Sequence, residues 1–413
     1  MKYLILLGDG MADWPLADYC GRTPLEVAAT PAIDRVVEMG VTGRFCPIPE
    51  GLPAGSDVGN LSCFGYDPRA SFRGRAPIEA AQQGIPLAED EVAFRCNLVT
   101  LDDDCMKDFT PGHITTQDAG ELIFELHKIL SQEFPASFHR GVSYRHTTLI
   151  RSSDAASVED MVELDCTPPH DISGQAWAPH LPKGAGAEMV ATMIRRSQEL
   201  LPGMEVNRRR VSEGLLPATS IWFWGQGKAP AMERYASKFG LSGAVVSAVD
   251  LVKGIGVLAG LEVLDVPGAT GWIDTDYSAK VAAALTALER HDFAYIHVEA
   301  PDETAHQGRA DLKIQAIEDF DSKVVAPCLE YMEGLPAYRV FVAPDHVTAI
   351  ETKTHAGGPV PFALCGTGVE ADSFVSYSEK DAAESELYFK LGHVLIGQML
   401  DEKPMLFDGG KSK

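Results

Sequence analysis

Short apolar runs alternate with amphipathic stretches at both ends of the chain. Residues 3–7, 293–298 and 339–342 are runs of mainly apolar side chains, the pattern of strands buried in a parallel sheet. Between these runs, apolar residues recur at helical spacing. The alternation predicts an α/β fold, with a mostly parallel sheet and helices on both of its faces.

Local start signals place several of the helices. Thr23 and Glu26 form a capping-box pattern with Pro24 at the first helical position, and Pro31 opens a second helix that ends near Gly40. One helix face is marked by Tyr277, Val281, Ala284, Leu285 and Leu288. A further helix is expected over residues 311–333, between two of the strands.

The pattern changes in the middle of the chain. Helices are expected at 116–131 and 186–201, but loops rich in Pro, His and Trp, such as residues 167–171, separate them. We therefore expect a smaller α/β domain, residues 88–245, to be inserted into a core formed by residues 1–87 and 246–413.

Composition narrows the class of protein. The 413 residues are 45% hydrophobic and 23% charged, which excludes global disorder, and 35 Lys+Arg against 59 Asp+Glu give a net charge of −24. Such a chain repels nucleic acid and anionic membranes, so we expect neither as a partner. The eight cysteines form no CxxC pair, and no apolar run approaches the ~20 residues of a membrane span. A cytoplasmic protein is the expectation.

Acidic and imidazole side chains follow three of the predicted strands. They are Asp9 after the first, Asp302 and His306 after the second, and Asp345, His346 and then His355 after the third. In an open α/β sheet, ligands bind beyond the carboxyl ends of the strands, so these segments should meet. Three carboxylates and three imidazoles suit ions such as Mn²⁺, Zn²⁺ or Mg²⁺, and suffice for two of them.

Each of these residues also has a structural interpretation. Asp9 between two glycines could be a turn residue, and Asp302 with His306 could be a helix cap and a surface imidazole. The threefold repeat of a strand followed by Asp favours the metal site.

A candidate nucleophile lies in the segment 53–60. Ser56 stands there among small residues in an expected Gly-rich turn, with room for a phosphate to approach, and nearby Ser62 is the alternative. The sequence contains no G-x-S-x-G elbow, no Walker A motif and no G-x-G-x-x-G after a strand. Ser-His-Asp hydrolase chemistry and nucleotide binding are therefore disfavoured.

Taken together, these residues resemble a known family. The order Asp9, Ser56 in GSDVGN, Asp302-x-x-x-His306, Asp345-His346 and His355 is similar to the alkaline phosphatase superfamily. Within that superfamily, the chain resembles the cofactor-independent phosphoglycerate mutases of the shorter, archaeal-type branch. The segments LGDGMAD, RGRAPIEAA, TPPHDISG, IWFWGQGK and ATGWIDTDY extend the resemblance over nearly the whole chain.

The resemblance implies a centre with two divalent ions. Asp9, Ser56, Asp345 and His346 match one metal site; Asp302, His306 and His355 match the other. Mn²⁺ is the expected ion, with Zn²⁺, Mg²⁺ or Co²⁺ as alternatives, and 2,3-bisphosphoglycerate is not required. Ser56 would carry the phosphoryl group while 3-phosphoglycerate and 2-phosphoglycerate are interconverted.

The inserted domain is expected to act as a lid that excludes water and supplies cations for the small phosphorylated substrate. The candidates are Arg95, His113, Arg140 and Arg145 in the insertion and Lys253 after it, each with a surface ion pair as its structural alternative. Two other functions stay open. One is phosphoryl transfer from ATP to homoserine, proposed for a bacterial subset of the family, and the other is a non-catalytic metal-binding scaffold. The oligomeric state is open as well.

Overall fold

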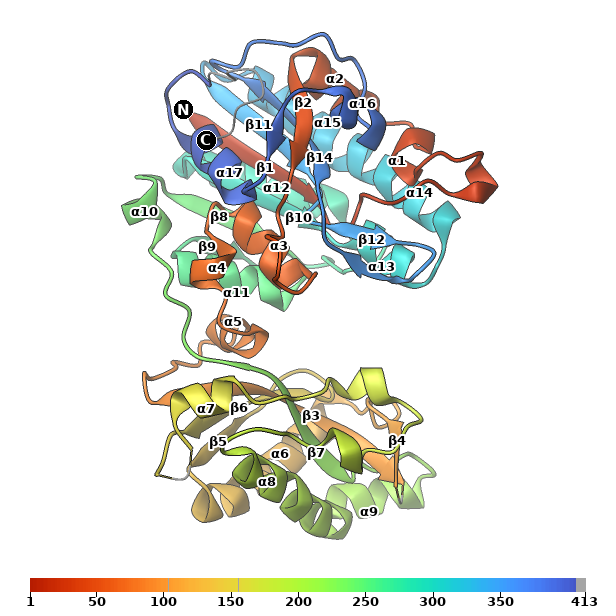
Figure 1. Cartoon of the computed structure of the whole chain (residues 1–413), viewed down its shortest axis with the longest axis vertical. Helices are drawn as coiled ribbons and strands as arrows, with labels where there is room; N and C mark the ends of the chain where they lie inside the picture. Colours follow the sequence, from red (N-terminus) through yellow and green to blue (C-terminus); the bar gives the residue numbers. More distant parts are fainter. Residues whose placement is uncertain (103, 155, 406–413) are drawn as a thin grey trace. The chain divides into compact units, whose positions relative to one another are not determined.

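The computed structural model describes residues 1–102, 104–154 and 156–405. Contacts between residues divide the chain into two compact units (Figure 1). The first unit is formed by Met1–Phe72 together with Ala231–Lys413, and the second by Arg73–Pro230. The second unit is therefore an insertion in the first.

The first unit contains an eight-stranded sheet. In spatial order its strands are β15 (Tyr388–Phe389), β2 (Gly40–Phe45), β14 (Val360–Gly366), β11 (Tyr338–Ala343), β1 (Lys2–Gly8), β10 (Phe293–Val298), β8 (Gly243–Val246) and β9 (Glu262–Leu264). Five of the seven neighbouring pairs are parallel, and β14 is antiparallel to both of its neighbours. The predicted mostly parallel α/β fold is confirmed.

The first strand of the chain lies at the centre of this sheet. Leu4 of β1 pairs with Ala294 of β10 on one side and with Val340 of β11 on the other, and all three strands run parallel. The carboxyl ends of parallel strands meet at one edge of a sheet. The segments that follow β1, β10 and β11 therefore converge.

Helices cover both faces of this sheet (Figure 1). Leu4 and Leu6 point to one face, in a core shared with α2 (Pro31–Glu38), α12 (Tyr277–Arg290), α14 (Ala310–Phe320) and α15 (Ala326–Glu333). On the other face, Phe64 at the end of α3 (Ser56–Cys63) stacks on Tyr295, with ring centroids 4.0 Å apart. Helices α11 (Asp250–Ala259) and α17 (Gly392–Leu400) pack against α3. The remaining elements are α1 (Pro24–Val27), α4 (Pro68–Ser71), α10 (Tyr235–Lys238), α13 (Ala300–His306), α16 (Glu379–Glu384) and the antiparallel pair β12 (Val347–Ala349) and β13 (Thr354–Ala356).

The predicted helix over 311–333 is interrupted. A π-helical turn, Asp321–Val325, separates α14 from α15. The Asp321 carboxylate in this turn accepts hydrogen bonds from the backbone amides of Ala32 and Ile33 at the start of α2. Thr30, the residue before α2, makes no side-chain cap, so Asp321 satisfies two of the amides that a helix start leaves free.

The second unit contains a five-stranded antiparallel sheet. Its strands are β4 (Cys105–Asp108), β3 (Glu91–Asp102), β6 (Arg145–Arg151) and β5 (Ala136–His139), and β7 (Ser220–Gly227) also pairs with β3. Its helices are α5 (Arg75–Gln82), α6 (Thr116–Glu133), α7 (Val158–Val162), α8 (Ala187–Leu200) and α9 (Glu205–Ser212). Phe94 of β3 lies in the core beneath α6 and α8, whereas Ala93, on the opposite face, packs against α5.

The boundaries of the second unit differ from the predicted ones. The unit begins at Arg73 rather than at 88 and ends at Pro230 rather than at 245. Ala76 of α5 packs against Ala93 and Leu149, which places this helix with the second sheet. Strand β8 pairs with β10, so residues 243–245 belong to the core sheet.

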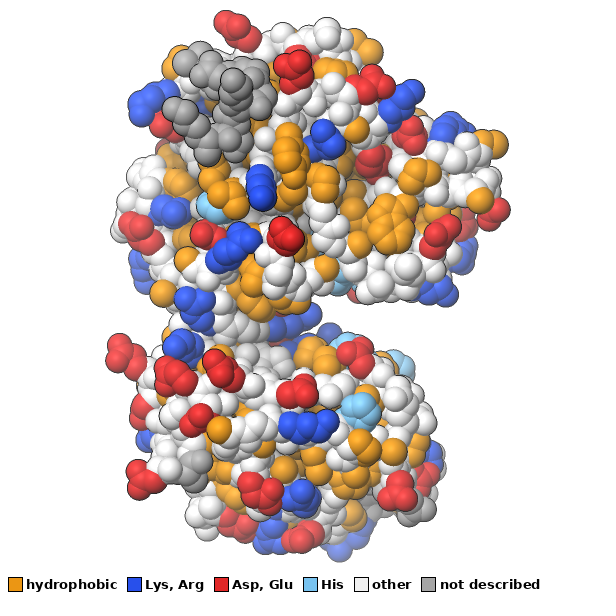
Figure 2. Space-filling view, in the orientation of Figure 1, with side chains coloured by type: hydrophobic (Ala, Val, Ile, Leu, Met, Phe, Trp, Pro, Cys, Tyr) orange, Lys and Arg blue, Asp and Glu red, His pale blue; other side chains and the backbone are white. Residues whose placement is uncertain are grey.

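Acidic side chains are dispersed over the surface. On the face shown in Figure 2, Asp and Glu lie among Lys and Arg over both units. Among the described residues, none of the helices is long and apolar enough to span a membrane.

Candidate active site

The carboxyl edge of the central strands gathers the predicted acidic and imidazole side chains. Asp9 directly follows β1, and Asp345 follows β11. Asp302 and His306 lie on α13, which begins just after β10, and His355 lies on β13. Asp9, Asp302, Asp345 and His346 are buried. This convergence is the geometry that the three strand ends predict.

One set of ligand atoms surrounds His346. Its Nε2 lies 3.4 Å from Asp9 Oδ1, 3.5 Å from Asp345 Oδ2 and 3.0 Å from Ser56 Oγ. The candidate ligand atoms of Asp9, Asp345 and His346 all lie within 4.8 Å of one another, the spacing expected around one ion.

A second set surrounds Asp302. Its carboxylate oxygens lie 3.2 Å from His306 Nε2 and 3.3 Å from His355 Nε2, and the two imidazole nitrogens are 2.9 Å apart. Ligand atoms of Asp302, His346 and His355 also lie within 4.8 Å of one another. His346 is therefore close to both sets.

The electrostatics of these groups favour a bound cation. Burial, together with the carboxylates of Asp345 and Asp302, raises the pKa of Asp9 well above its usual value. Asp9 Oδ1 also has no hydrogen-bond partner. Burial raises the pKa of Asp302, but hydrogen bonds from His306 and His355 outweigh it and bring this pKa well below its usual value. Crowded carboxylates with an unpartnered buried oxygen, beside imidazole nitrogens, form a donor set that fits divalent metal ions.

Ser56 is the first residue of helix α3, which corrects the expectation of a turn at this position. The turn ends at Gly55, and the helix forms although its sequence, SDVGNLSC, has weak helix propensity, because its second half is buried. The alternative nucleophile, Ser62, is fully buried, and its hydroxyl donates a hydrogen bond to the Pro47 carbonyl. Of these two serines, Ser56 is therefore the one whose hydroxyl contacts a candidate ligand.

Comparison with known proteins identifies the family. Residues 38–207 match the family model described as 2,3-bisphosphoglycerate-independent phosphoglycerate mutase. A protein of that name from Methanothrix thermoacetophila is 50% identical over 397 residues, which cover 96% of this chain and 98% of that protein. The chain belongs to the 2,3-bisphosphoglycerate-independent phosphoglycerate mutase family.

Solved structures extend this likeness to the fold. A protein from Pyrococcus horikoshii is 29% identical with a TM-score of 0.79, covering 97% of this chain and 96% of that one. A cofactor-independent phosphoglycerate mutase from Thermoplasma acidophilum is 25% identical with a TM-score of 0.65, covering 97% and 100%. The family resemblance inferred from the motifs is confirmed, and the fold is shared over the whole length.

In this phosphoglycerate mutase family member, the second unit carries a cluster of guanidinium groups. Arg75 and Arg95 lie 2.8 and 2.9 Å from the two carboxylate oxygens of Glu79. Arg145 pairs with Asn97 across the sheet, which places it on the same face as Arg95. Burial and the nearby charges of Arg75 and Arg145, offset in part by Glu79, lower the pKa of Arg95 to about 10. Three guanidinium groups thus act on the Glu79 carboxylate, and all three lower its pKa.

The five residues predicted to bind substrate do not all lie at one place in the structure. Arg95 and Arg145 belong to this cluster, whereas the Arg140 guanidinium lies over the Phe124 ring of α6, 4.7 Å from its centroid. His113 is exposed in the loop before α6, with a left-handed backbone (φ +52°). Lys253 belongs to the first unit, on α11.

Three neighbours of these residues were missed by the sequence reasoning. Asn60, one helical turn after Ser56, donates hydrogen bonds to the Ser56 carbonyl and to Asp345 Oδ2. His297 Nε2 lies 3.0 Å from Asp9 Oδ2, though not aligned for a hydrogen bond, and burial lowers the pKa of this imidazole to about 3. Arg75 lies in the RGRAPIEAA segment. Two of these residues had a signal in the sequence: His297 is an imidazole in a mainly apolar strand, and Asn60 lies four residues after Ser56, on the same face of a helix.

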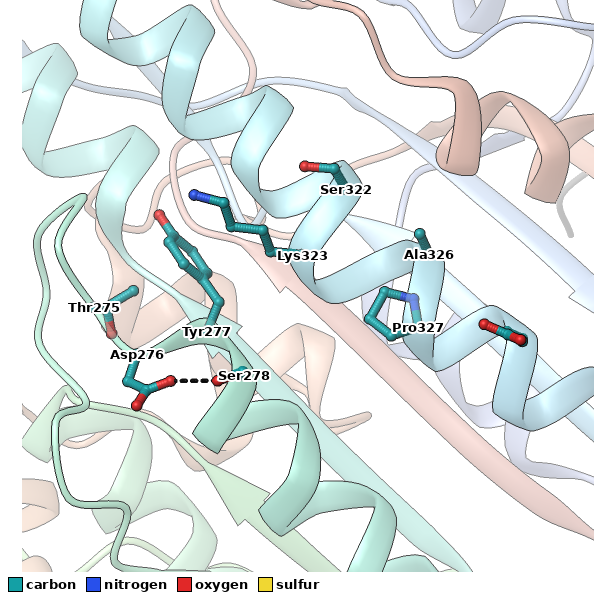
Figure 3. A pocket seen from close by; sticks show the side chains of 9 residues that line it. Thr275, Asp276, Tyr277, Ser278, Ser322, Lys323, Ala326 and Pro327 are labelled. Atoms are coloured by element: carbon teal, nitrogen blue, oxygen red, sulfur yellow. Dashed lines mark hydrogen bonds between the residues drawn. The ribbon is translucent and has the colours of Figure 1, made fainter.

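A separate open pocket of about 600 Å³ lies between the start of α12 and the π-helical turn with α15 (Figure 3). In this pocket the Lys323 ammonium lies 5.2 Å from the centroid of the Tyr277 ring. Asp276 accepts a hydrogen bond from Ser278 at its rim. None of the described residues that line it is a candidate metal ligand.

Gly59 is expected to be essential for the spacing between Ser56 and Asp345. A Cβ at this position would lie 2.5 Å from the Asp345 carbonyl oxygen, so Gly59→Ala must push α3 away from the ligands. We expect kcat for phosphoglycerate isomerisation to fall about 100-fold, the scale for displacement by about 1 Å. The matched control is Gly397→Ala on α17, where a Cβ meets nothing within 4 Å. It should keep wild-type activity and gain about 0.5–1 kcal/mol of stability. A Gly59→Ala protein with wild-type kcat would show that this contact does not position Ser56.

Proposed function

We propose that this chain interconverts 3-phosphoglycerate and 2-phosphoglycerate through a phosphoserine on Ser56, with two divalent metal ions and without 2,3-bisphosphoglycerate. The observation that carries the proposal is the placement of Ser56 Oγ, 3.0 Å from His346 Nε2, beside two sets of candidate ligands. The name carried by relatives that are 45–50% identical supports the same activity.

The candidate ligands divide between two ions. We assign Asp9, Ser56, Asp345 and His346 to one, and Asp302, His306 and His355 to the other, with His346 within reach of both sets. Oxygen and nitrogen donors of this kind suit Mn²⁺, and also Zn²⁺, Mg²⁺ or Co²⁺. Ions bound here would lower the pKa of the Ser56 hydroxyl and neutralise the oxygens of the phosphoryl group.

The transfer itself is carried by Ser56. Its deprotonated Oγ forms a bond to phosphorus as the bond from phosphorus to the 3-oxygen of glycerate breaks, and the departing oxygen takes up a proton. Glycerate then turns, its 2-hydroxyl loses a proton and attacks the same phosphorus, and Ser56 is released. Asn60 holds the Ser56 carbonyl and Asp345 together, which fixes the nucleophile beside the ligands.

We further propose that the second unit binds the carboxylate of the substrate and retains glycerate while the serine is phosphorylated. Arg75, Arg95 and Arg145 supply the positive charge, and all three lower the pKa of Glu79 against the effect of its burial. His113 and Lys253 stay predictions for the same role, as does the cytoplasmic location.

Arg145→Ala is expected to raise KM for 3-phosphoglycerate about 10- to 100-fold, the equivalent of one charge-assisted hydrogen bond. The ratio of inorganic phosphate to 2-phosphoglycerate should also rise, because glycerate escapes before it takes the phosphoryl group back. Both products are measured in the same reaction. Arg140→Ala is the matched control, since the Arg140 guanidinium lies over Phe124 instead. A larger effect at Arg140 than at Arg145 would locate the anion site elsewhere.

One paired assay tests the proposed reaction. The purified chain is given 3-phosphoglycerate with Mn²⁺ in one vessel and homoserine with ATP and Mg²⁺ in another. Formation of 2-phosphoglycerate without added 2,3-bisphosphoglycerate is the expected result. Phosphohomoserine in the second vessel alone would instead identify a kinase, and neither product from a metal-loaded chain would identify a scaffold.

A further inference from the structure

The hydroxyl of Thr348 lies between the two sets of candidate ligands. Its Oγ1 is 2.6 Å from Asp302 Oδ1 and 3.1 Å from His346 Nδ1, and the side chain is fully buried. Thr348 also pairs with His355 across the two strands β12 and β13. One side chain thus contacts a carboxylate of one set and the imidazole that lies close to both.

The number of protons decides the direction of these two hydrogen bonds. A threonine hydroxyl has one proton to donate, whereas an ionised carboxylate can only accept. The Thr348 proton therefore goes to Asp302, and Oγ1 must accept from His346. His346 consequently carries its proton on Nδ1, and Nε2 keeps a free lone pair.

The other contacts of His346 agree with this assignment. Ser56 Oγ lies 3.0 Å from Nε2, at the distance for a hydroxyl that donates to a lone pair. Asp9 Oδ1, 3.4 Å from the same nitrogen, has no hydrogen-bond donor, as expected if Nε2 bears no proton.

The backbone of Thr348 is held by a buried lysine. Lys313 Nζ donates to the carbonyl oxygens of Thr348 (2.7 Å) and Ala12 (3.0 Å) and to Asp13 Oδ2 (2.8 Å). These three bonds use all three protons of the ammonium group. The backbone of Gly10 also lies close to the hydroxyl, since a Cβ there would collide with Thr348 Oγ1. The hydroxyl therefore has little freedom to move.

We propose that Thr348 is a positioning residue that fixes the tautomer of His346 and the orientation of Asp302 through one hydroxyl. The Nε2 lone pair is thereby directed toward Ser56 and the carboxylates before any ion binds. Because the same hydroxyl contacts Asp302 and His346, it orients a candidate ligand of each ion site. This inference rests on the metal-binding part of the proposed function.

The test compares Thr348→Val, which removes the hydroxyl and keeps the shape, with Thr348→Ser, which keeps the hydroxyl. The tautomer of His346 is read from ¹⁵N spectra of histidine-labelled, metal-free protein, with its signals assigned by their loss in His346→Gln. Wild type and Thr348→Ser should show a protonated Nδ1, and Thr348→Val should show a mixture or a protonated Nε2.

The second measurement is the affinity for Mn²⁺, read from the EPR signal of free Mn²⁺. The affinity should weaken 10- to 100-fold in Thr348→Val and stay close to wild type in Thr348→Ser.

Thr42→Val is the matched control for this test. Thr42 is also fully buried and donates to a main-chain carbonyl, that of Phe362, but it contacts none of the ligands among the described residues. It should leave both the His346 signals and the Mn²⁺ affinity unchanged. A Thr348→Val protein with the wild-type His346 tautomer and the wild-type Mn²⁺ affinity would overturn this inference and leave the proposed function standing. A wild-type chain that binds none of Mn²⁺, Zn²⁺, Mg²⁺ and Co²⁺ would overturn the proposed function, and this inference with it.

Discussion

Replacing Ser56 with alanine is expected to lower isomerisation by at least about 10⁴-fold, because no other group can carry the phosphoryl between the two glycerate oxygens. The substitution removes one hydroxyl at the first position of α3 and leaves the buried residues of that helix in place. The fold should therefore survive, as a melting curve would show. Labelled 3-phosphoglycerate, quenched in acid, should leave phosphate on Ser56 in wild type and none in the variant.

Ser62→Ala is the matched control on the same helix. It removes the hydrogen bond to the Pro47 carbonyl, which costs about 1 kcal/mol of stability, and should leave most of the transfer activity. Phosphate trapped on Ser62, or on any histidine, would reject Ser56 as the nucleophile.

Removing divalent metal is expected to abolish activity, and Mn²⁺ should restore it. The carboxylates of Asp9, Asp302 and Asp345 are crowded and buried, so without cations the site cannot hold a further anionic phosphoryl group. Asp302→Asn and His355→Ala should each cost several orders of magnitude in kcat/KM by weakening one ion site, with circular dichroism unchanged. Full turnover after exhaustive chelation would disprove the two-metal mechanism.

The affinity for metal, and therefore the activity at limiting Mn²⁺, should increase with pH. The hydrogen bond that His306 donates to the Asp302 carboxylate raises the pKa of His306 to about 9 in the metal-free protein, so its imidazole is protonated at neutral pH. An ion must displace that proton, and metal affinity therefore rises with pH up to about 9 and falls in mild acid. At limiting Mn²⁺, activity should drop steeply as the pH is lowered and recover when more Mn²⁺ is added. Activity lost in acid that added Mn²⁺ does not recover would assign the pH dependence to another group.

Asp9, Asp302 and Asp345 could be predicted as candidate ligands because each comes shortly after an apolar run. These runs form the parallel neighbours β1, β10 and β11, whose carboxyl ends meet at one edge of the sheet. Thr348 could not be found in this way. A threonine in a short strand is unremarkable in sequence, and its role depends on the pairing of β12 with β13 and on Lys313, which is distant in the chain.

The domain boundary and the guanidinium cluster differ from the predictions because they depend on contacts between residues that are distant in the sequence. Residues 75–82, which form α5, fall within the predicted core segment 1–87, and only the contact of Ala76 with Ala93 and Leu149 places this helix with the second sheet. Likewise, the guanidinium cluster depends on the cross-strand register that places Arg145 on the face of Arg95, while Arg140, five residues earlier, lies over α6.

The central place of β1 has a consequence for how the molecule is made. This strand is made before the whole of the second unit, whereas both of its sheet neighbours, β10 and β11, are made after that unit. Arg73–Pro230 is one continuous stretch, and among the described residues its strands pair only with one another, so its sheet can form during synthesis. The central part of the core sheet must wait until β10 and β11 have been made, since pairing them with β1 closes long loops. Asp9 therefore meets Asp302 and Asp345 only after both strands have been made, and a chain that stops before β11 cannot assemble the candidate metal site.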